Sequence, residues 1–85
     1  MSYKIRKEKR SELQNGRTLT YLSNLCGCSR VYLSYVFNGY SNRKPTKEVI
    51  EKIIRGIAKD SVKVNKMLEQ QGMEETIKYF FKEIN

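Results

Sequence analysis

Four residues, Arg30, Val31, Ser34 and Tyr35, have side chains suited to contacts with the edges of DNA bases. An arginine guanidinium can pair in bidentate fashion with O6 and N7 of guanine, and an aliphatic side chain can pack on the methyl group of thymine. A serine hydroxyl donates or accepts, and tyrosine offers a hydroxyl and a flat apolar ring. Their spacing places them on two adjacent stripes of a helix. The alternative for each is an exposed helix residue without a function of its own.

The segment that must position these residues, 19–39, has the pattern of two short helices joined by a tight turn. Apolar residues recur at i, i+3 and i+4 on one helical face before the turn and again after it. These residues are Leu22, Leu25 and Cys26, and then Leu33, Val36 and Phe37. Two apolar faces this close in sequence must pack on each other at a steep angle, which predicts a helix-turn-helix.

The capping and turn residues of this segment support the same prediction. Gly27 can adopt a left-handed backbone at no steric cost, which suits the end of a helix. Ser29 can accept hydrogen bonds from the free amides of the second helix, and Thr18 or Thr20 can do so for the first. Asn38 and Gly39 together form a strong turn signal that ends the unit.

Net charge is distributed unevenly along the 85 residues, which are few enough to predict one domain. The whole chain carries +8. Residues 1–45 hold nine Lys and Arg and two Glu, a charge of +7, whereas residues 46–85 hold eight Lys and Arg and seven Asp and Glu, a charge of +1. The predicted helix-turn-helix therefore lies in the basic half, which indicates a polyanionic partner. The alternative is an ordinary solvated basic surface.

The residue types argue against several other classes of protein. Cys26 and Cys28 are the only cysteines and the chain has no His, so we expect neither a zinc site nor a cofactor. A Cys-x-Cys pair across a tight turn is a poor disulfide candidate, and we interpret both residues as small apolar side chains. No nucleophile motif or carboxylate pair is present, so we expect no enzyme. No apolar run is long enough to span a membrane, and no secretory signal follows the basic start, which predicts a cytoplasmic, nucleoid-associated protein.

We predict an all-α fold, a compact bundle of five to six short helices, with no segment that alternates like a strand. Thr46 is expected to cap the fourth helix, and Gly72 to end the fifth. Residues 1–60 would form the DNA-binding core, and residues 61–85 would complete that core within the same domain. The six helices are expected at about 3–14, 18–26, 30–37, 46–58, 62–71 and 74–84.

These residues resemble a known family. The stretch GCSRVYLSYVFNG is similar to the helix-turn-helix of the lambda-repressor-like superfamily, the Cro/cI-type regulators. Followed by KPTKEVIEKI, it is also similar to the head-piece of LacI-type repressors. The resemblance covers residues 13–57 and rests on Gly27, Ser29, Leu33, Val36, Asn38 and Gly39, with Leu22 and Cys26 before the turn.

The chain departs from the family pattern at three positions. Ser23 stands where a small residue, often Ala, is usual, and Cys28 stands where Val follows the turn glycine. Both substitutions keep the size or the apolar character. Leu19 replaces the Gln that opens the equivalent helix in cI-type proteins, so a phosphate contact from that side chain is not expected.

The resemblance implies that Arg30, Val31, Ser34 and Tyr35 face base edges in the major groove. Short polar and basic groups around the two helix N-termini and the following loop suit phosphate oxygens, and their alternative role is to form caps and turns. The candidate phosphate contacts are Thr18, Thr20, Ser29, Tyr32, Asn38, Tyr40, Asn42, Arg43 and Lys44. Lys4, Arg6, Lys7, Lys9 and Arg10 add a cationic flank, of which some members reach a phosphate and most are solvated.

A second copy of the chain is an expected partner, because one recognition helix reads few base pairs and such regulators bind palindromes as dimers. The C-terminal helices carry unusual apolar bulk that suits a dimer interface, or alternatively completes the monomer core. The candidate interface residues are Met67, Met73, Ile77, Phe80 and Phe81.

The leading hypothesis is a sequence-specific DNA-binding regulator, a small repressor of phage, plasmid or mobile-element type, that binds double-stranded DNA. A second class is a protein-binding module on the same scaffold, an antitoxin or a phage-encoded inhibitor, with DNA binding as autoregulation. A third class is RNA binding or non-specific nucleoid binding.

Overall fold

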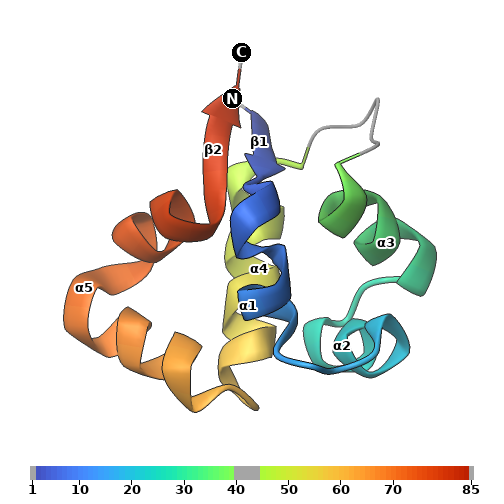
Figure 1. Cartoon of the computed structure of the whole chain (residues 1–85), viewed down its shortest axis with the longest axis horizontal. Coiled ribbons are helices and arrows are strands. Elements are labelled where there is room, and N and C mark those ends of the chain that lie inside the picture. Colours follow the sequence, from blue (N-terminus) through green and yellow to red (C-terminus); the bar gives the residue numbers. More distant parts are fainter. Residues whose placement is uncertain (1, 40–44, 85) are drawn as a thin grey trace.

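The computed structural model describes residues 2–39 and 45–84, which form five α-helices, one 3₁₀ helix and a two-stranded sheet (Figure 1). The elements are β1 (Ser2–Ile5), η1 (Lys7–Lys9), α1 (Arg10–Gln14), α2 (Leu19–Cys26), α3 (Arg30–Asn38), α4 (Lys47–Ala58), α5 (Val62–Phe80) and β2 (Phe81–Ile84). The predicted predominance of helix is confirmed, but the prediction of an all-α chain is wrong because of the sheet.

Helix α4 runs through the middle of the molecule, with α2 and α3 on one side and α5 on the other (Figure 1). Its apolar stripe is wide enough to face both sides at once. Ile50, Ile53, Ile54 and Ile57 are all buried. Thr46 occupies its N-cap position, but the side chain makes no capping hydrogen bond, contrary to the sequence prediction.

The two chain ends form the sheet, and this corrects the predicted helices at 3–14 and 74–84. β1 pairs antiparallel with β2, so that Ile5 lies opposite Phe81. Both side chains are buried in the core. The first helix is reduced to η1 and the five residues of α1, while the last helix ends at Phe80. Pairing of the two ends covers the core and provides hydrogen-bond partners for backbone N–H and C=O groups that either end alone would leave without one.

The predicted break at Gly72 is present inside α5, where the residue has φ 85° and ψ 172°. Beyond this break, Ile77 and Phe80 are buried, as is Phe81 at the start of β2. They complete the core of the single chain, which is the alternative role that the sequence leaves open for them. Met67 and Met73 are half-buried and pack against the same core.

Candidate nucleic-acid interface

The α2–α3 unit, residues 19–38, owes its geometry to caps at both helix starts and to a left-handed turn. Thr18 Oγ1 accepts a hydrogen bond from the amide of Tyr21 at 3.1 Å, so Thr18 rather than Thr20 caps α2. Ser29 Oγ accepts from the amide of Tyr32 at 3.1 Å and caps α3 as predicted. Gly27, with φ 66°, ends α2 and turns the chain. These local interactions fix where α3 begins.

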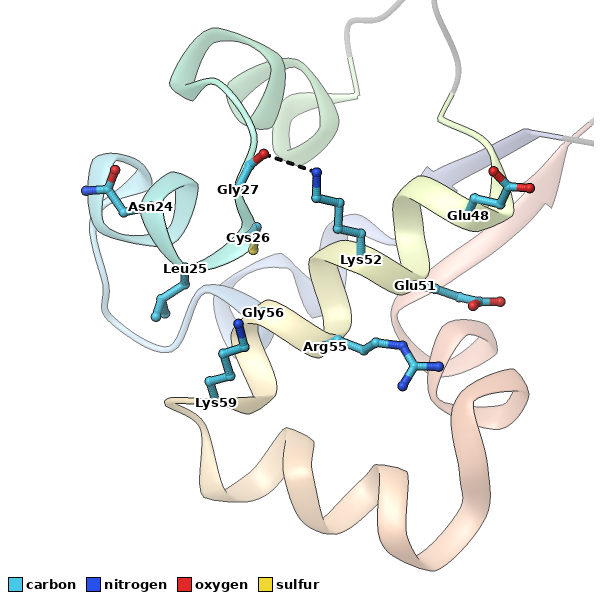
Figure 2. A pocket seen from close by; sticks show the side chains of 10 residues that line it. All are labelled: Asn24, Leu25, Cys26, Gly27, Glu48, Glu51, Lys52, Arg55, Gly56 and Lys59. Carbon is cyan, nitrogen blue, oxygen red and sulfur yellow. Dashed lines mark hydrogen bonds between the residues drawn. The ribbon is translucent and has the colours of Figure 1, made fainter.

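Close packing against α4 holds the unit on the rest of the molecule. Cys26 Sγ donates to the carbonyl of Ile53 at 3.4 Å, and Lys52 Nζ donates to the carbonyl of Gly27 at 3.1 Å (Figure 2). Gly56 lies against the backbone of Cys26. The end of α2 is therefore fixed to α4 by backbone contact as well as by side chains.

Helix α3 presents two distinct faces. Leu33, Val36 and Phe37 are buried, as their spacing predicts. On the other side, Val31 is 58% exposed and Tyr35 49% exposed, and Arg30 is also exposed. Val31 and Tyr35 thus expose apolar surface next to the cation of Arg30, a combination that suits contact with a macromolecular partner.

Ser34, the fourth predicted base-contacting residue, is half-buried and tied into a short hydrogen-bond chain. Asn38 Nδ2 donates to the Ser34 carbonyl at 2.9 Å and to Ser34 Oγ at 3.2 Å. Arg10 Nη1 in turn donates to Asn38 Oδ1 at 3.0 Å. Ser34 Oγ accepts this one hydrogen bond from Asn38 and keeps its proton and a second lone pair, so the hydroxyl can still donate to an acceptor such as N7 or O6 of guanine. The sequence analysis did not predict this hydrogen-bond network, because Arg10 and Asn38 are 28 positions apart and no local pattern connects them.

The predicted phosphate contacts divide into three groups. Thr18, Ser29 and Asn38 are exposed but already form caps or side-chain hydrogen bonds, so they fill the alternative role in addition to any other. Thr20 is exposed, and Tyr32 is half-buried with a pKa raised by burial. Tyr40, Asn42, Arg43 and Lys44 lie outside the described residues.

An open groove of about 660 Å³ is lined by the end of α2 and by α4 and is an alternative candidate site (Figure 2). Its cations are Lys52, Arg55 and Lys59, and its carboxylates are Glu48 and Glu51. In Figure 2, Lys52 points to Gly27, while Arg55 and Glu51 point away from α2. The mixed charge and the engagement of Lys52 make the groove a feature of helix packing rather than a site for an anion.

Within residues 2–39 and 45–84, no group of three or more Cys, Asp or Glu is placed to hold a metal ion. The described helices include none with the length and apolar character needed to cross a membrane. Comparison of the chain with protein-family models, with curated proteins and with solved structures finds no match.

Proposed function

We propose that this protein is a sequence-specific DNA-binding transcriptional regulator, a small repressor, in which the α2–α3 unit acts as a helix-turn-helix. In this proposal α3 lies in the major groove. Arg30 contacts guanine, Val31 and Tyr35 pack against base edges, and Ser34 donates a hydrogen bond to a base acceptor.

The observation that carries the proposal is the outward face of α3. A half-exposed tyrosine, a more exposed valine and an exposed arginine share one side of a helix whose other side is buried. Such a face combines a bidentate donor with apolar groups, which are the chemical types used for direct reading of bases. The caps at Thr18 and Ser29 add helix N-termini, where backbone amides favour anions.

The charge around this face supports the same interpretation. Residues 2–39 contain seven Lys and Arg, and only Arg17 forms an ion pair with a carboxylate among the described residues. Glu12, one of the two acidic residues in this stretch, is itself paired with Lys63. Most cations of this stretch are thus not neutralised by a carboxylate among the described residues and can attract a polyanion, whose binding would release counterions.

We further propose that the regulator binds a palindromic operator as a homodimer, because a single helix reads too few base pairs for a specific site. Burial of Ile77, Phe80 and Phe81 removes those side chains from the interface, so Met67 and Met73 are the candidate interface residues that remain. Light scattering across a concentration series tests this part, and a mass that stays monomeric contradicts it.

Selection of bound duplexes from a random pool tests the proposed function. The proposal predicts an enriched palindrome with at least about 10³-fold preference over unrelated DNA. Recovery of duplexes without a common motif would favour non-specific nucleoid binding. Absence of DNA binding, with capture of a protein through Val31 and Tyr35, would favour the protein-binding module.

A further inference from the structure

A basic pocket lies beside the C-terminal end of α3, outside the residues assigned above to base reading. It measures about 290 Å³ and is bordered by β1, η1 and α1 on one side and by the end of α3 on the other. Its polar lining is cationic: Lys4, Lys7 and Arg10 contribute, and none of the residues lining it is acidic. Ile5 and Phe37, both buried, form its apolar part. We call it the terminal-strand pocket.

The three cations are not neutralised within the part of the chain that the structure describes. None of them forms an ion pair with a carboxylate in residues 2–39 or 45–84. Arg10 donates to the neutral amide oxygen of Asn38, which leaves its charge and most of its N–H groups unused. Three like charges around one pocket repel one another, and an anion in the pocket would relieve that repulsion.

Backbone geometry brings the pocket and α3 into direct contact. Gly39, the C-cap of α3, has φ 69°, and a β-carbon there would lie 3.1 Å from Lys4 Cε. The stem of Lys4 therefore lies against the end of α3. A second pocket shares Lys4 and Lys7 and extends toward β2. Its lining adds the cations Arg6 and Lys82 and one carboxylate, Glu8, so its charge is still predominantly positive.

We propose that the terminal-strand pocket binds a backbone phosphate of the duplex that α3 reads, on the flank of the recognised bases. The inference rests on the proposed function and adds a site to it. Lys4 and Lys7 neutralise the phosphate as point charges, and Arg10 binds it with the N–H groups left free by Asn38. Phosphate contacts fix the register of a protein on DNA, while base contacts supply specificity.

Arg10 also links this phosphate to the reading face. Arg10 donates a hydrogen bond to Asn38, and Asn38 donates one to Ser34 Oγ. The flanking phosphate and the Ser34 hydroxyl would therefore belong to one hydrogen-bond network. Arg10 is thus a positioning residue for Ser34 as well as a phosphate ligand. The cations also lie near the C-terminal end of α3, where positive charge is favourable, and that role alone would require no DNA.

The test compares two double variants with the same change in charge. Lys4→Gln/Lys7→Gln removes both lysines of the pocket. Lys59→Gln/Lys66→Gln removes two exposed lysines, one between α4 and α5 and one in α5. Affinity for the selected duplex is measured over a salt series for both variants and for the unaltered chain. Circular dichroism and the denaturant midpoint verify that each variant is folded.

The pocket variant is expected to lower the slope of log K against log salt by about 0.9 for each phosphate that the protein no longer binds. Its preference for the selected site should stay within about threefold of that of the unaltered chain, because phosphate contacts carry no sequence information. Shortening the duplex on the flank that the pocket contacts should remove the difference in salt slope between the pocket variant and the unaltered chain.

The control variant should keep the original slope. Equal slopes for the two double variants would overturn the phosphate site and leave the role of α3 standing. If the unaltered chain binds no duplex, both proposals fall.

Discussion

The backbone of Cys26 passes so close to Gly56 that a β-carbon on Gly56 would lie 2.7 Å from Cys26 Cα. This approach joins α2 to α4, and through α2 it sets the position of the proposed reading helix. Only a residue without a side chain permits it.

Gly56→Ala should therefore destabilise the protein. Alanine is favoured over glycine in a helix by about 1 kcal/mol, but the clash with backbone cannot be relieved by a side-chain rotation. Overpacking of this kind costs about 1–3 kcal/mol, so we expect a net loss in the free energy of unfolding, measured by denaturant titration. Arg55→Ala, an exposed change on the same helix, serves as the control. A variant at Gly56 as stable as the unaltered chain would contradict the close packing.

Ser29→Asp separates capping from DNA binding. Aspartate caps helices about as well as serine, so the free energy of unfolding should change by less than about 0.5 kcal/mol. The added negative charge lies at the start of α3, where a phosphate is proposed, and should weaken binding of the selected duplex by roughly tenfold or more. Gln70→Asp, at an exposed position of α5, adds the same charge away from α3 and serves as the control. Equal effects of the two substitutions on binding would argue against DNA at the start of α3.

Stability should fall in acid, in part through Asp60. Arg17 Nε donates to Asp60 Oδ2 at 2.7 Å and the Tyr21 hydroxyl donates to Oδ1 at 3.1 Å, and both interactions lower the pKa of Asp60 below its ordinary value of 3.8. A carboxyl whose pKa is lower in the folded chain stabilises above its unfolded pKa and loses that effect as the pH falls through the folded pKa.

Asp60→Asn measures this contribution. The variant should be less stable than the unaltered chain at about pH 7. This difference in the free energy of unfolding should shrink as the pH falls below about 3.8, and should vanish below the lowered pKa of folded Asp60. Denaturant titrations over a pH series give the comparison. A difference independent of pH would assign the effect to lost packing instead of charge.

The thiol of Cys26 should resist alkylation in the folded chain. Burial raises its pKa to about 11, and Sγ is hydrogen-bonded to the carbonyl of Ile53, so little reactive thiolate is present at about pH 8. Mass spectrometry after treatment with iodoacetamide should show Cys26 modified only when denaturant unfolds the protein. Rapid modification in native buffer would contradict the burial of α2 against α4.

The sequence predicts the α2–α3 unit well because its signals are local. The buried Leu22 and Phe37, the turn at Gly27 and the cap at Ser29 each follow from neighbours within about four residues. α4 is predicted for the same reason, since its isoleucines recur at helical spacing.

The sheet could not be predicted in this way. Ile5 and Phe81 pair in the sheet although they lie near opposite ends of the sequence, and each strand has only four residues. The helical spacing of Ile77, Phe80, Phe81 and Ile84 also continues past the true end of α5 at Phe80, so periodicity alone extends the helix too far. The link from Arg10 through Asn38 to Ser34 depends on the same long-range packing and leaves no local pattern.

The central claim, that α3 reads base edges, is tested most directly by Arg30→Ala, with Arg55→Ala as a control of equal charge. Affinity is measured for the selected duplex and for an unrelated duplex at one salt concentration. If α3 reads bases, Arg30→Ala loses about 1–3 kcal/mol on the selected duplex and much less on the unrelated one, while Arg55→Ala preserves the preference. An equal loss on both duplexes would contradict a base contact from Arg30 and with it the proposed reading face.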